Sequence, residues 1–307
     1  MSSCFSLVSL YGSFLRCSLT ASGLSSQFVD VDVDTTVHFW GPTPSSSQSK
    51  NGVSKKSSIV LIHGFGPPGV WQWRQQVSFL APYFNVYVPD LVFFGESTTK
   101  SSERSEIFQA EVIGKLMEKV GVDKYSVIGT SYGGFVTYRL AEMWPERVEK
   151  VVVASSGINM RPIDNVEIMK RADVETIDEL MLPETAGQLR KLLRFAANLS
   201  RVYVPDCILN DFIEKLYRKN RKEKLELLEG LTLGKNDNPN ISPLHQEVLI
   251  IWGDQDNIFP VDMAKELKEM LGKKAALEVM KKASHLLQIQ QARNFNKIIY
   301  SFFCASS

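Results

Sequence analysis

Residues 125–134 of this 307-residue chain read YSVIGTSYGG and decide the fold class. The run begins with continuous apolar residues, typical of a strand buried on both faces of a sheet. At Phe135 a helix-period stretch begins, in which apolar residues recur at the spacing of one face of an α-helix. Strand, sharp turn and helix together place Ser131 in a G-x-S-x-G motif, where Gly129 and Gly133 let strand and helix approach closely. Such a turn, called a nucleophile elbow, lifts the serine hydroxyl clear of the sheet. The alternative is a glycine-rich turn that carries Ser131 incidentally.

Five further apolar runs flank this stretch, and each is short, continuous and followed by glycine or polar residues. They are residues 58–62, 85–88, 151–154, 248–252 and 277–280. Helix-period stretches lie between them, at residues 73–80, 107–120, 135–143 and 261–271. Because strands that alternate with helices form βαβ units, we expect an α/β fold with a mostly parallel, doubly wound sheet.

One interruption of this alternation predicts an insertion. Residues 158–245 contain no run typical of a parallel strand, but they contain helix-period segments at 185–199 and 208–231. The stretch is far longer than an ordinary βα connection. We therefore expect residues 28–157 and 246–307 to form the α/β core, with 158–245 as a helical insertion.

The first residues differ in composition from the rest of the chain. Residues 1–29 contain no acidic side chain and one basic side chain, Arg16, among many serines. Residues 1–27 lack the basic start and long apolar stretch of a secretory signal. We expect them to form an N-terminal arm of a cytoplasmic protein, and the alternative is a targeting segment for an organelle of the plastid type.

A hairpin is predicted after this arm. Residues 28–34 alternate between apolar and acidic side chains, which is the period of a half-buried strand. Residues 35–40 are rich in β-branched and aromatic side chains and are expected to pair with it. Residues 42–58 have no periodicity and predict a surface loop.

Composition and charge exclude several function classes. With 35 basic and 34 acidic side chains, the chain lacks the basic excess typical of nucleic-acid-binding proteins. No apolar run approaches the roughly 18–20 residues that a transmembrane helix needs. Cysteines and histidines show no metal-ligand spacing, so we expect no metal site. A basic run at 215–224, inside the expected insertion, predicts a solvated helix face; the alternative is attraction to an acidic partner or peripheral contact with an anionic membrane.

A serine hydroxyl becomes nucleophilic when a base removes its proton and a carboxylate orients that base. The candidate bases are His38, His63, His245 and His285. Of these, only His285 follows the last predicted strand and precedes a closing amphipathic helix at 286–303. His285 is therefore the expected base for Ser131, and we expect His38 and His245 to be satisfied or exposed.

Two aspartates follow the preceding strand and compete for the role of the acid. Asp254 comes directly after Gly253 and can be used by the turn itself, whereas Asp256 lies further along the loop. We expect Asp256 to reach His285, with Asp254 as the alternative. The order Ser131, Asp256, His285 is the one found with elbows of this kind.

An anion site is expected beside the elbow. The sequence HGFG at residues 63–66 ends an early strand, and its glycines allow a backbone N–H to point into the site. We expect the N–H groups of Phe65 and Tyr132 to form an oxyanion hole. His63 is expected to brace this loop.

Together these motifs resemble the α/β-hydrolase superfamily. They comprise HGFG at 63–66, VPDL at 88–91 with Gly95 and Ser97, GTSYGG at 129–134, PERV at 145–148, WGDQD at 252–256 and SH at 284–285. The chain is similar to core-plus-cap serine hydrolases, among them monoacylglycerol lipases and meta-cleavage-product hydrolases. It also resembles a plant branch that carries Trp-Gln-Trp, here at residues 71–73.

The resemblance implies a triad of Ser131, Asp256 and His285, and oxyanion donors at Phe65 and Tyr132. It also implies that residues 158–245 form a helical cap over the site, and that no cofactor is needed. The implied activity is hydrolysis of a small or medium apolar carboxylic ester or a monoacylglycerol through an acyl-enzyme. The alternatives are carbon–carbon bond hydrolysis, a lyase or acyltransferase reaction with the same triad, and a ligand-sensing receptor.

The chain departs from the family pattern in two places. Ser284 precedes the histidine where glycine is usual, and residues 289–293 read IQQAR where the family often has Glu-Lys/Arg-Pro. Neither change removes a catalytic group, although Ser284 can alter how freely His285 is presented. Serine at position 131 argues against the dehalogenases and epoxide hydrolases of this superfamily, which use aspartate there.

Overall fold

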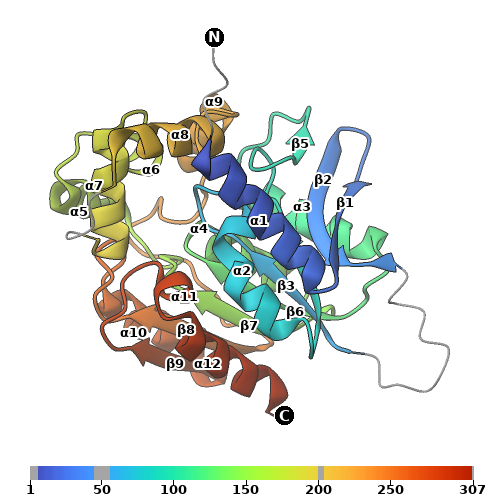
Figure 1. Ribbon diagram of the computed structural model, residues 1–307. Coiled ribbons are helices and arrows are strands. Elements are labelled where there is room, and N and C mark those ends of the chain that lie inside the picture. The colour runs from blue at the N-terminus through green and yellow to red at the C-terminus, as the bar shows by residue number, and fades with distance from the viewer. Residues whose placement is uncertain (1–5, 45–55, 200–203, 306–307) are drawn as a thin grey trace.

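The computed structural model describes residues 6–44, 56–199 and 204–305 (Figure 1). At its centre is a nine-stranded sheet with the order β1-β2-β4-β3-β6-β7-β8-β9, and β5 pairs with β2. The strands are β1 (Leu24–Asp30), β2 (Thr35–Pro42), β3 (Ser58–Ile62), β4 (Asn85–Pro89), β5 (Thr98–Thr99), β6 (Tyr125–Thr130), β7 (Val148–Ala154), β8 (Glu247–Gly253) and β9 (Ala275–Met280). Along the sheet order from β4 through β3, β6, β7 and β8 to β9, all neighbouring strands are parallel. Strand β2 is antiparallel to its neighbours β1, β4 and β5. The predicted doubly wound sheet is confirmed.

Helices cover both faces of this sheet. One face carries α1 (Leu7–Ala21), α2 (Gly69–Leu80) and α12 (Ala292–Cys304), and the other carries α3 (Glu106–Lys119), α4 (Tyr132–Met143) and α10 (Val261–Leu271). Along β3, Ile59 and Leu61 pack toward the first set, while Val60 and Ile62 pack toward the second. Because both faces are buried, the parallel strands consist of continuous apolar residues.

Five helices lie between β7 and β8 and gather on one side of the sheet (Figure 1). They are α5 (Pro162–Ala172), α6 (Ile177–Met181), α7 (Ala186–Ala197), α8 (Asp206–Leu216) and α9 (Arg221–Glu229). The sequence did not predict α5 and α6. The single segment expected at 208–231 is wrong, because Asn220 adopts a φ of 55° and separates α8 from α9.

The expected arm contains a helix that the sequence did not predict. Helix α1 begins after Ser6, whose side chain accepts a hydrogen bond from the N–H of Ser9. Its Leu15 and Leu19 are fully buried in the core on the α2 face. Residues 1–5 lie outside the described residues.

The first hairpin differs from the prediction in where its first strand begins and ends. Strand β1 begins at Leu24, before the start expected at residue 28, and residues 31–34 form the turn. The carboxylate of Asp32 accepts a hydrogen bond from the N–H of Asp34 at 3.1 Å. This aspartate turn ends the strand although the apolar–acidic alternation continues.

The predicted closing helix at 286–303 is two helices, α11 (Leu287–Gln290) and α12, because the backbone at Gln291 is not helical. Of the loop expected at 42–58, residues 45–55 lie outside the described residues. In the described part of the chain, no helix is long and apolar enough to cross a membrane.

Candidate active site

Ser131 occupies a strained turn between β6 and α4, with a φ of 52° and a ψ of −121°. A non-glycine residue adopts a positive φ only where its surroundings enforce it. Close packing provides that enforcement: a Cβ on Gly129 would lie 2.1 Å from the carbonyl oxygen of Gly133, and one on Gly133 would lie 2.4 Å from that of Ile62. Only glycine permits this approach of strand and helix.

His285 and Asp256 form a buried pair, with Nδ1 of the histidine 2.9 Å from Oδ2 of the aspartate. The other carboxylate oxygen accepts hydrogen bonds from the N–H groups of Ile258 and Phe259, at 2.9 and 3.0 Å. Asp256 is therefore held as an acceptor, so that Nδ1 of His285 donates and Nε2 stays free to act as a base. Of the two candidate aspartates, the structure brings Asp256 and not Asp254 to His285.

Ser131 and His285 both line a cavity of about 430 Å³ that is bordered by the loop after β3 and by residues of the inserted helices. A smaller cavity of about 90 Å³ adjoins Ser131 and Phe65, and its walls are almost entirely apolar. No acidic or basic side chain lines the smaller cavity, and Arg74 is the only Lys or Arg among the described residues that line the larger one. The site thus has two apolar spaces beside one serine.

Two backbone N–H groups lie beside the serine. Tyr132 is the first residue of α4, where an N–H has no intrahelical acceptor. Phe65 lies in the loop after β3, and its ring is 5.7 Å from that of Tyr132 in an edge contact. Within the described residues, neither N–H donates to another protein group. Such a pair of donors is suited to an oxyanion.

Gln72 of α2 fixes this loop, a role that sequence reasoning missed. Its Oε1 accepts the N–H of Gly64 at 2.9 Å, and its Nε2 donates to the carbonyls of Gly64 and Pro67 at 2.9 and 2.6 Å. The available signal was the Trp-Gln-Trp at residues 71–73 directly after the loop.

His63 is fully buried and braces the same loop. Its Nδ1 donates to the carbonyl of Gly64 at 2.8 Å, and its Nε2 accepts the N–H of Leu91 at 3.0 Å. Burial lowers the pKa of the His63 imidazole below its usual range, which keeps it neutral. Both ring nitrogens are occupied by backbone groups, so His63 is not available as a base.

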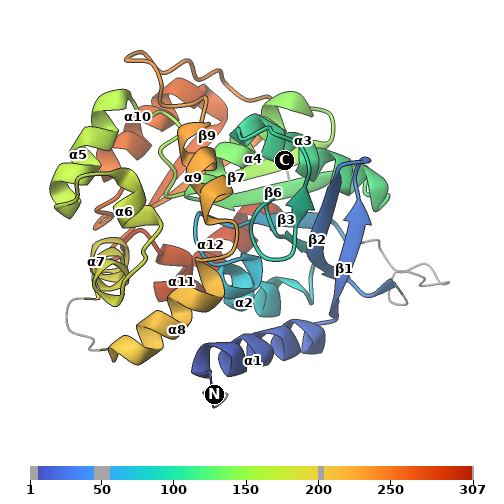
Figure 2. The ribbon, with the colours of Figure 1, turned by 90° about the horizontal axis from the view of Figure 1, so that it is seen from above.

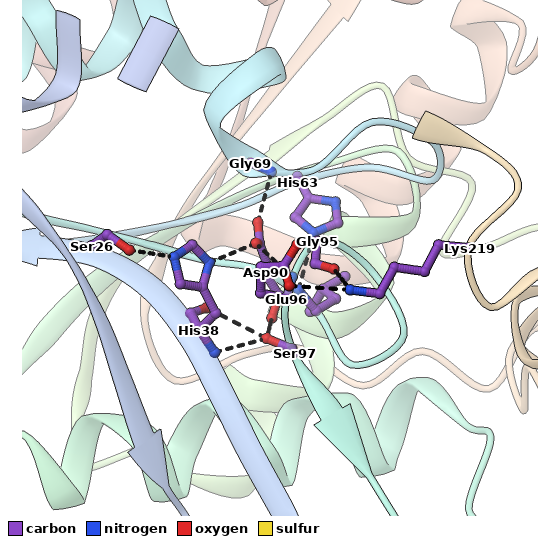
Figure 3. A network of polar contacts seen from close by, with 10 residues as sticks. Ser26, His38, His63, Gly69, Asp90, Gly95, Glu96, Ser97 and Lys219 are labelled. Atoms are coloured by element: carbon purple, nitrogen blue, oxygen red, sulfur yellow. Dashed lines mark hydrogen bonds and ion pairs between the residues drawn. The ribbon is translucent and has the colours of Figure 1, made fainter. Parts of the chain in front are cut away.

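A second Ser–His–Asp arrangement joins the β1–β2 hairpin to β4 (Figure 3). Ser26 Oγ lies 2.8 Å from Nε2 of His38, whose Nδ1 lies 2.8 Å from Oδ2 of Asp90. Asp90 also accepts the N–H of Gly69 at 3.2 Å, at the start of α2. Ser26 is exposed on a strand and lines neither cavity beside Ser131. We interpret this chain of bonds as a structural link between hairpin and loop.

The two departures from the family pattern face each other. The Ser284 hydroxyl hydrogen-bonds the side-chain oxygen of Gln290, whose amide nitrogen donates to the carbonyl of Ala197 at the end of α7. Ser284 directly precedes His285. The departures therefore connect the loop that carries His285 to the inserted helices.

Most of the basic run at 215–224 is engaged by carboxylates. The pairs are Arg218–Glu214 at 2.8 Å, Lys219–Glu96 at 3.2 Å, Arg221–Glu184 at 2.7 Å and Lys222–Glu226 at 3.8 Å. Lys224 is instead buried, with its ammonium 5.1 Å from the ring centre of Phe94, and burial lowers its pKa to about 8. This face has little free positive charge to offer an anionic surface.

The family model described as the alpha/beta hydrolase fold matches residues 58–292. The chain belongs to the α/β-hydrolase family. It is 25% identical to a 2-hydroxy-6-oxononadienedioate/2-hydroxy-6-oxononatrienedioate hydrolase of Pseudomonas putida, over 91% of this chain and 96% of that one. A 2-hydroxy-6-oxo-6-phenylhexa-2,4-dienoate hydrolase of Burkholderia cepacia is 24% identical, over 82% of this chain and 89% of the relative.

Solved structures share this α/β-hydrolase fold. A bacterial membrane phospholipase A superposes with a TM-score of 0.79 at 20% identity, covering 96% of this chain and 91% of that one. A 2-hydroxy-6-oxo-6-phenylhexa-2,4-dienoate hydrolase from Rhodococcus superposes with a TM-score of 0.72 at 24% identity, covering 92% and 99%. These structures have different activities, so the fold alone does not select the substrate.

Proposed function

We propose that this protein is a serine hydrolase that cleaves a carboxylic ester of an apolar acid through an acyl-enzyme on Ser131. The observation that carries the proposal is that Ser131, in its strained elbow, opens onto two apolar cavities beside the buried pair of His285 and Asp256. The helices inserted at 158–245 supply walls to both cavities, and we propose that they act as a cap.

In the proposed mechanism, Ser131 Oγ attacks the ester carbonyl while Nε2 of His285 takes its proton. Asp256 stabilises the imidazolium that forms. The N–H groups of Phe65 and Tyr132 donate to the oxyanion of the tetrahedral intermediate. His285 then gives its proton to the leaving alcohol, and a water molecule activated by the same imidazole hydrolyses the acyl-enzyme.

Charge distribution supports an ester over the acids named for the relatives. Those names describe a dienedioate and a dienoate, which carry carboxylates. A carboxylate in an apolar cavity needs a cation or several donors to offset its desolvation. The smaller cavity offers no cation, and Arg74, one of whose five N–H groups donates to the carbonyl of Trp71 at 2.6 Å, is the only Lys or Arg among the described residues that line the larger one.

Carbon–carbon bond hydrolysis is the second candidate, because the relatives' names favour it. Both reactions use the same serine, so the substrate must decide. We expect the purified protein to hydrolyse p-nitrophenyl esters and monoacylglycerols of a preferred chain length, and to leave 2-hydroxy-6-oxo-6-phenylhexa-2,4-dienoate nearly unchanged.

Arg74→Ala separates the two candidates. Ester kcat/KM should change little, because a neutral substrate does not need the guanidinium. Preferential turnover of the dienoate, abolished in Arg74→Ala, would replace the ester proposal with carbon–carbon hydrolysis.

A further inference from the structure

Helix α1 presents an apolar stripe to solvent. Four large side chains are spaced as on one helix face and are 42–63% exposed: Leu7, Leu10, Tyr11 and Phe14. The opposite side of the same helix is buried, through Val8, Leu15 and Leu19 among others. The stripe is thus a second apolar face, in addition to the face that packs on the protein.

Helix α1 is fixed both to the inserted helices and to the α/β core. At its beginning, the Ser6 hydroxyl and the N–H of Val8 donate to the carboxylate of Asp211 on α8, at 2.7 and 3.2 Å. In its middle, the ring of Tyr11 contacts the edge of Trp71 on α2, at 5.4 Å between ring centres. Figure 2 shows α1 lying along the side of the molecule beside α2 and α8. The stripe therefore has a defined position.

The stripe continues into the mouth of the larger cavity. Tyr11 belongs to the stripe and also lines the cavity that contains Ser131 and His285. Leu199, after α7, lines the same cavity and is 37% exposed. A ligand that enters this cavity thus crosses an apolar rim formed by α1 and the inserted helices.

The charges around the stripe suit a lipid surface. Residues 1–29 contain no acidic side chain and only Arg16 as a basic one, and the uncharged Ser9, Ser13 and Ser18 lie between the apolar residues of the helix. Nothing on α1 repels lipid phosphates, and the basic run at 215–224 is largely paired. A contact made by this face would depend on apolar insertion with little electrostatic attraction.

We propose that the α1 stripe docks the protein on a phospholipid bilayer, so that the rim of the larger cavity opens toward the membrane. Leu10 and Phe14 insert among the acyl chains, and Tyr11 lies at the boundary between lipid and cavity. A lipid ester can then pass into the site without crossing water. This last step rests on the proposed function, whereas docking itself does not.

Sedimentation with phosphatidylcholine vesicles tests docking. A double variant of the stripe and a matched control are both made in the Ser131→Ala background, so that catalysis does not contribute. Leu10→Ser/Phe14→Ser should weaken the vesicle partition coefficient by on the order of tenfold or more. The matched control is Ile163→Ser/Val166→Ser, which removes two side chains of similar exposure from α5 and should bind unchanged. Binding should also change little between low and high salt, because few charges take part.

Three results would overturn the proposal. They are an unchanged partition for Leu10→Ser/Phe14→Ser, an equal loss in the control pair, or a dimer that dissociates in Leu10→Ser/Phe14→Ser and so assigns the stripe to a second copy. Leu10→Trp guards against misfolding: its emission should shift to shorter wavelength with vesicles, while that of Ile163→Trp should not. With Ser131 intact, Leu10→Ser/Phe14→Ser should retain turnover of soluble short-chain esters and lose turnover of vesicle-borne ester.

Discussion

The side-chain amide of Gln72 hydrogen-bonds both the N–H and the carbonyl of Gly64, each at 2.9 Å. Gly64 directly precedes Phe65, the proposed oxyanion donor. Helix α2 thereby holds the backbone of the loop in one orientation, and α2 is itself positioned by Asp90 through the N–H of Gly69. The proposed oxyanion hole thus depends on a side chain that holds the loop backbone through hydrogen bonds to Gly64 and Pro67.

Gln72→Ala should therefore lower kcat by roughly 10- to 100-fold with little change in KM, because small displacements of catalytic groups are costly. Steady-state kinetics on a soluble p-nitrophenyl ester measure this. Gln76→Ala is the matched control, since Gln76 is a buried glutamine on the same helix that bonds Gln288 and Asn296 instead. It should reduce stability and spare kcat; equal losses in both variants would refute the positioning role of Gln72.

Asp256→Asn should lower kcat by on the order of ten-thousandfold, because an amide cannot hold the His285 tautomer as a carboxylate does. Asp254→Asn should stay within a few fold of the wild type. Single-turnover kinetics give the chemical step for both. The opposite ranking would show that the acid has been assigned to the wrong aspartate.

The link from Ser284 through Gln290 to Ala197 predicts coupling between the proposed cap and the loop that carries His285. Gln290→Ala and Ser284→Gly should each lower kcat/KM, most strongly for long acyl chains that contact the cap. Because both changes break one link, their effects should not add in a double-mutant cycle. Gln291→Ala is the control, as its side chain bonds Lys281 and not the cap. Additive effects would mean that no such link operates.

Lys224 predicts a pH dependence of stability. Its folded pKa is about 8, whereas the ordinary value is 10.5, so the unfolded chain binds more protons between these pH values. Its contribution to the free energy of unfolding therefore rises with pH across this window, and the buried charge destabilises most below pH 8. In urea titrations, the free energy of unfolding of Lys224→Met should exceed that of the wild type most at pH 7. This gain should shrink by about 3 kcal/mol toward pH 10, and a constant difference would contradict the prediction.

Much of the core could be predicted from the sequence because its signals are local. The parallel strands are continuous apolar runs. The elbow is a short motif that requires its glycines, because a Cβ added at Gly129 or Gly133 would lie only 2.1 or 2.4 Å from a backbone oxygen. Asp256 was preferred over Asp254 on loop position alone, and the structure places it against His285. The resemblance added the expectation that the inserted helices form a cap over the site.

What the sequence did not predict depends on tertiary contacts. Helix α1 has apolar side chains on two faces, so its pattern did not indicate which face would be buried. The separation of α8 from α9 depends on the single left-handed residue Asn220. Gln72 acquires its role only when the loop folds back onto α2. The bonds that join Ser26, His38 and Asp90 likewise connect positions far apart in the chain.

The most direct test of the central claim is labelling and turnover in Ser131→Ala. Wild-type protein should react with a fluorophosphonate probe at Ser131, located by peptide mass spectrometry, and should hydrolyse p-nitrophenyl esters. Ser131→Ala should lose labelling and about a million-fold in kcat. Undiminished ester turnover in Ser131→Ala, or a wild-type label found at Ser26 and absent from Ser131, would contradict the account.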